Sequence, residues 1–219
     1  MSTLSNREIA AILRSYSLET DEKSTLVEAI QLYIPILLQW NRSVSLTTIT
    51  DPEQIVRFHF GESLFAASLL PIEDGRLADV GTGAGFPGLP LKMLAPSLDL
   101  KLIESNTKKA AFLAEVTRKL SIDRVHVSRN RMEEVDGTFE FITARALGQF
   151  ESLLTWAEQH LAGPGRLILW VGSEDINSVS QSPGWKWATP ALIPGSDRRF
   201  IISGSPERAV DRGNVPRGT

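Results

Sequence analysis

Apolar positions in the first 70 residues follow a helical period. Between residues 9 and 16, and again between 26 and 40, apolar side chains recur every three or four positions, which predicts two amphipathic helices. A third helix is predicted from Asp51-Pro52 towards residue 70, because Asp caps helices and Pro fits their first turn. We therefore expect residues 1–70 to form an N-terminal helical cap.

From residue 71 onwards the pattern changes to short apolar strands separated by helical segments. Strands are predicted at 76–80, 98–103, 125–127, 139–143 and 166–171, with helices at 107–120, near Glu133 and at 150–161. Strands that alternate with helices form a mostly parallel sheet that is covered on both faces. Two later segments, 185–192 and 198–203, flank a Pro-Gly-Ser-Asp turn and predict a closing antiparallel hairpin.

Together these segments predict an α/β fold with a mostly parallel seven-stranded sheet over residues 71–204. The cap and this domain are expected to form one compact unit. Residues 205–219 are rich in Gly, Pro and Arg, and we expect them to be a flexible tail.

The composition excludes several classes of protein. The chain has 219 residues and a net charge of −3, from 23 basic and 26 acidic residues, so it is not a polycationic nucleic-acid-binding protein as a whole. It has no cysteine, which excludes disulfides, thiolate metal sites and a cysteine nucleophile. No apolar run approaches the roughly 20 residues of a membrane helix, and the N-terminus lacks a signal-peptide layout. We expect a cytoplasmic protein, by default a monomer.

Residues 79–88, which follow the first predicted strand, carry the clearest functional signal. Glycines at 81, 83 and 85 allow the backbone to turn tightly and to approach a ligand closely. Open parallel sheets bind ligands at the carboxyl ends of their strands, where this loop lies. Glu104 ends the second predicted strand, and a carboxylate there can accept hydrogen bonds from both ribose hydroxyls of an adenosine. The loop therefore predicts an adenosine cofactor.

Two adenosine cofactors fit the glycines. Gly83, Gly85 and Gly88 satisfy the dinucleotide pattern G-x-G-x-x-G, so an NAD site is one interpretation. Asp79 precedes the loop, however, and a carboxylate disfavours a pyrophosphate but suits the cationic methionyl end of S-adenosylmethionine. An Asp followed by alternate glycines also resembles motif I of class I, Rossmann-like methyltransferases. We favour S-adenosylmethionine.

A more specific resemblance follows from motifs on both sides of this loop. They are Trp40-Asn41, Leu46-Thr47, Asp51-Pro52, His59, Ser63-Leu64, the loop itself with its Phe86-Pro87-Gly88 extension, Lys108-Lys109, Phe112-Leu113, Arg131-Met132-Glu133-Glu134 and Ala144-Arg145-Ala146. In this order they resemble the glucose-inhibited division protein B family, bacterial small-subunit (16S) ribosomal RNA methyltransferases that modify guanine at N7. The resemblance covers about residues 37 to 172.

The resemblance implies cofactor contacts at Gly81, Phe86, Met132, Glu133 and Arg145. The chain also departs from the family pattern at several positions. Val171 stands where the family has Lys, Ser45 where it has Asn, Gly61-Glu62 where it has Leu-Asp, and Glu104 where it has Asp. The missing lysine removes a cation from the expected RNA-binding surface.

The chemistry of guanine N7 sets the remaining expectations. N7 carries a lone pair and no proton, so methyl transfer needs positioning and no general base, and we name no catalytic residue. Residues 98–132 hold eight basic and four acidic residues, and the predicted RNA contacts are Lys108, Lys109, Arg129 and Arg131. His59 is interpreted as structural, and no cluster of His, Asp and Glu predicts a metal.

Two other functions also fit the sequence. One is a small-molecule methyltransferase on the same fold, which the modest basic surplus allows. The other is a catalytically silent RNA-binding or ribosome assembly factor that has kept the fold. Binding of S-adenosylmethionine separates the silent protein from both enzymes.

Overall fold

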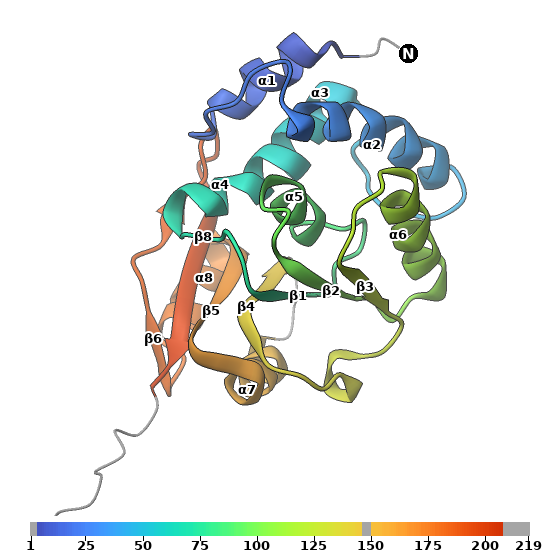
Figure 1. The fold of residues 1–219 in the computed structure, drawn as a ribbon. Helices are drawn as coiled ribbons and strands as arrows, with labels where there is room; N and C mark the ends of the chain where they lie inside the picture. Colours follow the sequence, from blue (N-terminus) through green and yellow to red (C-terminus); the bar gives the residue numbers. More distant parts are fainter. Residues whose placement is uncertain (1–3, 146–149, 208–219) are drawn as a thin grey trace, which may run out of the picture.

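A computed structural model describes residues 4–145 and 150–207, and its centre is one twisted sheet with helices on both faces (Figure 1). In the described residues the sheet has eight strands, one more than predicted, in the order β3-β2-β1-β4-β5-β8-β6, with β7 paired to β8. The strands are β1 (Arg76–Val80), β2 (Asp99–Ile103), β3 (Val125–Ser128), β4 (Phe139–Arg145), β5 (Leu161–Gly172), β6 (Trp185–Trp187), β7 (Ala191–Leu192) and β8 (Arg199–Pro206).

The predicted mixture of parallel and antiparallel pairing is confirmed. Strands β1 to β5 pair in parallel, and β8 pairs antiparallel with β5, β6 and β7. The extra strand arises because the segment 185–192, predicted as one strand, is two short ones. Pro190 lies between them, and proline has no N–H for a strand ladder. Strand β8 also runs to Pro206, two residues into the predicted tail, and residues 208–219 lie outside the described part.

The helices of the N-terminal segment, which we call the cap, lie above the sheet in Figure 1. Its helices are α1 (Asn6–Arg14), α2 (Thr25–Asn41), α3 (Pro52–Ile55), the π-helix η1 (Val56–Gly61) and α4 (Glu62–Leu69). Asp51 caps α3 by accepting from Gln54 N, as its position before Pro52 predicts. The third predicted helix is therefore continuous, but a π-helical segment interrupts its α-helical geometry.

The remaining helices lie between the strands. They are α5 (Gly88–Leu94), α6 (Thr107–Lys119), the 3-10 helix η2 (Met132–Glu134), α7 (Phe150–His160) and α8 (Ser173–Ser180). The segment predicted near Glu133 is thus a single short turn and not an α-helix. Among the described residues, no helix is long and apolar enough to cross a membrane.

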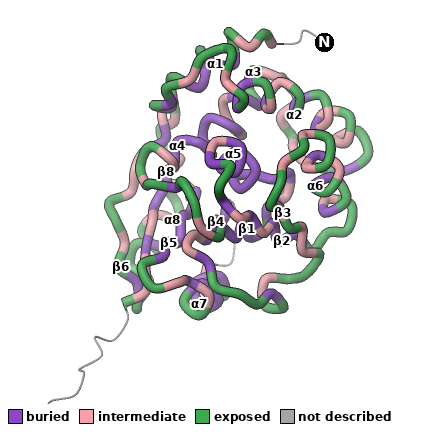
Figure 2. Tube along the Cα trace, in the orientation of Figure 1, coloured by how far each residue is buried: buried purple, intermediate pink, exposed green. Residues whose placement is uncertain are grey.

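Two hydrophobic clusters lie on opposite faces of the sheet. One joins the cap, α5 and α6 to side chains such as Leu77, Leu100 and Trp170. The other joins α7 and α8 to side chains such as Ala78 and Ile142. Neighbouring strand residues fall into different clusters because successive side chains point to opposite faces. Figure 2 shows α5 buried between the cap and the sheet, so cap and sheet share one core.

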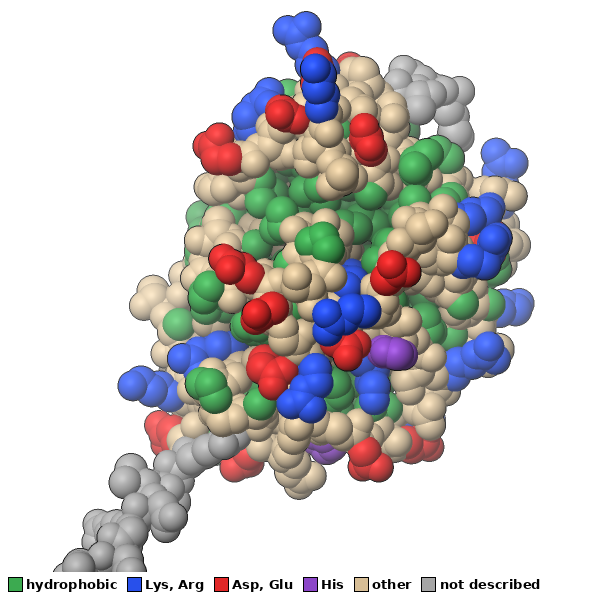
Figure 3. Space-filling view, viewed as in Figure 1, with side chains coloured by type: hydrophobic (Ala, Val, Ile, Leu, Met, Phe, Trp, Pro, Cys, Tyr) green, Lys and Arg blue, Asp and Glu red, His purple; other side chains and the backbone are tan. Residues whose placement is uncertain are grey.

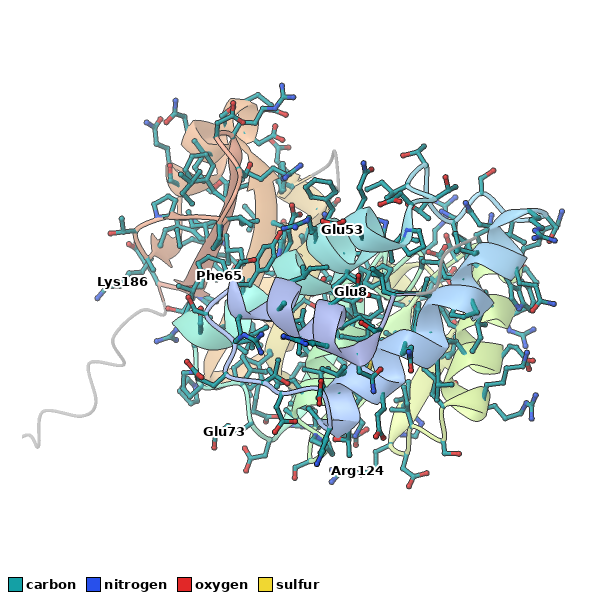
Figure 4. All side chains as sticks on the ribbon, turned by 90° about the horizontal axis from the view of Figure 1, so that it is seen from above. Glu8, Glu53, Phe65, Glu73, Arg124 and Lys186 are labelled. Carbon is teal, nitrogen blue, oxygen red and sulfur yellow. The ribbon has the colours of Figure 1, made fainter. Side chains whose placement is uncertain are left out.

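Different parts of the molecule lie beside the amino ends and the carboxyl ends of the parallel strands. Glu73 precedes β1 and Arg124 precedes β3, and both lie on one side of the molecule in Figure 4. Glu53 of α3 lies on the other side in that view. Helix α3 therefore lies on the side of the carboxyl ends of the strands, where α/β sheets bind ligands.

Candidate active site

The loop between β1 and α5 has the backbone that its glycines predict. Gly81, Gly83 and Gly85 have φ angles of 65°, 58° and 84°, which side chains rarely adopt. The N–H of Gly81 donates to the carbonyl of Ile103 at 2.9 Å, which ties the loop to the end of β2. The loop therefore lies at the carboxyl ends of β1 and β2, as predicted.

The glycines differ in the space beside them. A Cβ at Gly85 would lie 2.5 Å from Leu89 Cδ1 and 3.0 Å from the hydroxyl of Tyr33, so Gly85 is required for packing. A Cβ at Gly83 would meet, among the described residues, only the carbonyl oxygen of Gly81 at 3.9 Å. Gly83 therefore borders open space, and it is the glycine at which a ligand can approach the backbone.

The cap also holds this loop through contacts with Ala84 and Phe86. The buried hydroxyl of Tyr33, on α2, donates to the carbonyl of Ala84. The ring of Phe86 stacks on His59 of η1 with centroids 4.8 Å apart and meets Phe60 edge-on at 5.1 Å. Phe86 is only 8% exposed, so its ring supports the loop and leaves its backbone as the part available to a ligand.

Replacing Tyr33 with Phe tests this support. The variant leaves the carbonyl of Ala84 buried without its donor, which costs about 1–3 kcal/mol. We expect urea unfolding to show this loss and calorimetry to show weaker cofactor binding. Tyr16→Phe is the control, because Tyr16 is a buried tyrosine of the cap that does not bond the loop. Equal stability and affinity in the two variants would contradict the role of Tyr33.

Asp79 has a different place from the one predicted. It is fully buried, its Oδ2 accepts from Gly88 N at 2.9 Å, and its Oδ1 accepts from the Thr143 hydroxyl at 2.8 Å. Burial raises the pKa of Asp79 to about 6, and the hydrogen bonds from Thr143 and Gly88 oppose the rise. Asp79 thus joins β1, β4 and the start of α5 and does not face the open space.

Glu104 lies beside the loop, as predicted from its place after β2. Its Oε2 accepts from Gly83 N at 3.0 Å and its Oε1 accepts from Asn106 N at 2.8 Å. Each carboxylate oxygen has a second lone pair, so both can also accept hydroxyl donors. The carboxylate is therefore fixed next to the glycine that borders open space.

Met132 and Glu133 lie in η2, after β3. Met132 is partly buried and packs on the cluster that contains Val80 and Ile103, at the ends of β1 and β2. Glu133 is exposed. The structure thus brings Met132 to the strand ends that carry the loop and leaves Glu133 at the surface next to it.

Arg145 is the last residue of β4, and it does not stand alone. Its Nη2 donates to Glu62 Oε2 at 2.7 Å, and Arg199 Nη2 lies 2.8 Å from Glu62 Oε1. Glu62 is 1% exposed; burial raises its pKa, and the two guanidinium groups oppose the rise. Arg145 Nη1 is buried and has no hydrogen-bond partner among the described residues. Arg145 therefore keeps a free donor although it forms a salt bridge.

The four predicted RNA contacts lie on two different parts of the surface. Lys108 and Lys109 are in the first turn of α6, on the cap face of the sheet. Arg129 lines a groove together with Lys101 and His126. The strand neighbours of Lys101 and His126 pack on the cap face, so these two side chains point to the opposite face of the sheet. Arg131 immediately precedes η2. Lysine and arginine alternate with acidic side chains on the face that Figure 3 shows, so that face has no single basic patch.

His59 is supporting structure, as interpreted from the sequence. Its Nε2 lies 2.7 Å from the hydroxyl of Thr47, which itself accepts from Ile49 N at 3.0 Å. Burial, with Arg145 nearby, lowers the pKa of His59 to about 4, so the ring is neutral at pH 7 and can accept from Thr47. In the described part of the chain, no group of three or more His, Asp or Glu could hold a metal ion.

Three residues of this region were not singled out from the sequence: Tyr33, Glu62 and Arg199. Tyr33 belongs to the apolar face of α2, and apart from its hydroxyl nothing in the sequence distinguishes it from a core residue. Glu62 had a signal, since an acid at this position is part of the family pattern. Arg199 begins β8, and only the antiparallel pairing of β8 with β5 brings it near Arg145.

Comparison with known sequences gives a consistent set of relatives. The chain matches the GidB family, described as rRNA small subunit methyltransferase G, over residues 26–183. A ribosomal RNA small subunit methyltransferase G from Xylella fastidiosa (strain 9a5c) is 39% identical over 164 residues, 74% of this chain and 76% of the relative. A protein of the same name from Stenotrophomonas maltophilia (strain K279a) is 34% identical over 202 residues, 89% of this chain and 94% of the relative.

Solved structures confirm the predicted fold class. A ribosomal protein L11 methylase from Lactobacillus delbrueckii subsp. bulgaricus superimposes with a TM-score of 0.60 at 16% identity, covering 68% of this chain and 79% of that one. A SAM dependent methyltransferase from Aquifex aeolicus has a TM-score of 0.55 at 17% identity, covering 70% and 97%. At sequence identities of 16% and 17%, the structural similarity shows a shared fold and nothing about function.

Proposed function

The chain belongs to the GidB family, the rRNA small subunit methyltransferases G, and from this premise we propose that it methylates N7 of a guanine in small-subunit ribosomal RNA. S-adenosyl-L-methionine is the methyl donor. The observation that carries the proposal is the open space at Gly83 beside the fixed carboxylate of Glu104. A carboxylate in this position can accept hydrogen bonds from the ribose hydroxyls of an adenosine, and a glycine lets the ligand approach the backbone closely.

The described residues fit this methyl donor. Glu104 would hold the ribose hydroxyls, and the backbone of Gly81, Gly83, Gly85 and Phe86 would lie against the nucleoside. Met132 and Glu133 would border the adenine, where a methionine side chain can pack on the ring face. The unpartnered Nη1 of Arg145 is a buried donor that suits the methionyl carboxylate. Asp79 would act indirectly, by holding the loop to β4 and α5.

The reaction needs positioning more than acid–base chemistry. S-adenosylmethionine supplies a methyl group on a sulfonium, and guanine N7 offers a lone pair without a proton. An in-line arrangement of the two is sufficient, so no residue has to remove a proton. The neutral His59 near the loop is consistent with this, because its ring is held by Thr47 and Phe86.

Transfer of a labelled methyl group tests the function. The protein is incubated with tritiated S-adenosylmethionine and, separately, small ribosomal subunits, naked small-subunit RNA and a metabolite extract. We expect label in RNA, and 7-methylguanosine after its digestion. Label in a metabolite alone would show a small-molecule methyltransferase, and cofactor binding without transfer would show a silent assembly factor. Mapping the methylated base identifies the nucleotide.

Glu104→Gln tests the ribose contact. The amide nitrogen of Gln cannot accept a hydrogen bond, so one hydroxyl of the ribose, or one backbone N–H, is left without its charged acceptor. We expect calorimetry to show about 10- to 100-fold weaker binding of S-adenosylmethionine, in line with about 1.5–3 kcal/mol for a hydrogen bond to a charged group. Glu140→Gln is the control, because Glu140 pairs with Arg76 at the opposite edge of the sheet. Unchanged affinity in Glu104→Gln would remove Glu104 from the site.

We further propose that RNA phosphates contact Lys108, Lys109, Arg129 and Arg131, from two sides of the cofactor site. The enzyme would act as a monomer in the bacterial cytoplasm. The cap, residues 1–70, and the methyltransferase domain, residues 71–204, would form one unit, in line with their shared core.

A further inference from the structure

A second pocket lies next to the proposed cofactor site, along the same edge of the sheet. Strand β4 lies between β1, which leads into the glycine loop, and β5. The pocket has a volume of about 390 Å³ and is bordered by the carboxyl ends of β4 and β5. Its apolar lining includes Trp170, Ile193 and Phe200. Its charged lining consists of two cations and three carboxylates: Arg145, Arg199, Glu62, Glu174 and Asp175. Such a lining suits a flat ring that carries a hydrogen-bond acceptor.

Arg199 is held in place but is not fully used by the protein. Its Nη2 lies 2.8 Å from Glu62 Oε1, and its guanidinium carbon lies 4.9 Å from the ring centre of Phe58. These two contacts fix the plane of the guanidinium group. Its Nε is buried and has no hydrogen-bond partner among the described residues, whereas 42% of the side chain as a whole is exposed, so the exposed part is the part that a ligand can reach. A guanidinium group has five donors, so Arg199 can still donate to a ligand.

Glu62 gives the two arginines fixed places relative to each other. One carboxylate oxygen binds Arg145 at 2.7 Å and the other lies 2.8 Å from Arg199. The carbonyl of Glu62 also accepts from Trp170 Nε1 at 2.8 Å, which ties the start of α4 to the pocket wall. Arg145 ends β4, the strand next to β1 and its glycine loop, and Arg199 lies opposite the end of β5.

On the β5 side of the pocket, the cation comes from β8. Val171, where the family pattern has lysine, is 5% exposed and adds no charge to the pocket it lines. Arg199 lies opposite Gly172 in the antiparallel register of β5 and β8, one step from Val171. Among the residues that line the pocket, Arg199 is therefore the cation nearest to the end of β5.

We propose that this pocket receives the target guanine of the RNA and that Arg199 determines specificity by donating to its O6. The inference rests on the proposed function and adds a residue for base recognition. Guanine O6 is an acceptor, whereas adenine carries an amino donor at the same position. Arginine commonly binds both O6 and N7 of guanine. Methyl transfer needs the N7 lone pair, so Arg199 binds O6 alone.

This arrangement agrees with the charge that moves in the reaction. The N7 lone pair forms a bond to the methyl carbon while the carbon–sulfur bond breaks and its electron pair stays on sulfur. The positive charge passes from sulfur to the guanine ring, and no proton is transferred. Glu62 lies between the two arginines and lowers the net charge of these three groups from +2 to +1, and Glu174 and Asp175 add two negative charges to the pocket lining. These carboxylates reduce the repulsion that a cationic product meets.

The test combines a protein change with a base change in one cycle. Small-subunit RNA is prepared with guanine, inosine or 2-aminopurine at the mapped position, and kcat/KM is measured for the wild type and for Arg199→Ala. Inosine keeps O6, and 2-aminopurine lacks it. We expect Arg199→Ala to lower kcat/KM on guanine about 10- to 100-fold, the range for one specific base contact. On 2-aminopurine, already slow in the wild type, we expect no further loss.

The controls separate this inference from the proposed function. Binding of S-adenosylmethionine to Arg199→Ala should stay within about twofold of the wild type, which shows that the site folds. Arg199→Lys keeps a cation and should recover part of the activity on guanine and inosine. If the losses from Arg199→Ala and from 2-aminopurine multiply fully, or if Arg199→Ala retains wild-type activity, the inference is overturned. If the wild type methylates no RNA, the proposed function itself fails.

Discussion

Replacing Gly83 with Val is expected to abolish measurable binding of S-adenosylmethionine, with at least about a 100-fold loss of affinity. The space beside Gly83 is open in the structure, so the new side chain fills the volume proposed for the nucleoside. Gly83 has a φ of 58°, and a side chain there also costs about 1–3 kcal/mol of backbone strain. Isothermal titration calorimetry measures the loss.

The chain offers a matched control for the strain. Gly184 has a φ of 76° and no heavy atom of the described residues within 4 Å of an added Cβ, but it lies in the turn before β6. Gly184→Val should lose a similar amount of stability and bind the cofactor normally. Wild-type affinity in Gly83→Val, at a comparable melting temperature, would contradict the proposed position of the nucleoside.

The contribution of Asp79 to the free energy of unfolding should fall as the pH rises from about 4 to about 6. Its pKa is about 6 in the folded protein, above the ordinary 3.8 of the unfolded chain. Below pH 4 both states hold the proton and Asp79 has no effect. Between these values the folded state alone keeps the proton, so folding becomes less favourable as the pH rises. The full difference is about 3 kcal/mol, and it remains constant above pH 6.

Asp79→Asn should remove this pH-dependent part of the free energy of unfolding. The amide oxygen can accept from Gly88, and the amide nitrogen can donate to the Thr143 hydroxyl, which lies 3.4 Å from the carbonyl of Ala78 and can turn towards it. Urea unfolding at pH 4, 5, 6 and 7 measures the difference between the variant and the wild type. Asp123→Asn is the control for an exposed acid. A constant difference across this pH range would show that Asp79 does not titrate there.

Local sequence patterns were sufficient to predict the geometry of the glycine loop and the position of Glu104 beside it. The strand before the loop, the positive φ angles of its glycines and the place of Glu104 all follow from short segments whose geometry is set by neighbouring residues. The alternation of strands and helices likewise predicted the parallel order. These features depend on periodicity and on glycine, which sequence displays directly.

Contacts between distant segments were harder to predict. Nothing local to Arg145 indicates that its partner is Glu62, 83 positions away in the chain, or that Arg199 completes the cluster. The π-helical register of η1 has no sequence signal, although it sets the positions of His59 and Phe60 against Phe86. For Asp79, the sequence predicted a carboxylate next to the loop but not that Thr143 and Gly88 would use both of its oxygens.

The bond from Tyr33 to Ala84 limits how the chain can be divided in engineering. A fragment that starts at residue 71 keeps every glycine of the loop but loses Tyr33, His59 and Phe60, which support the loop. It also loses Glu62 and leaves two arginines close together without their shared counter-ion. A chimaera that gives this sheet a new N-terminal region must therefore keep Tyr33, the π-helix η1 and Glu62 together.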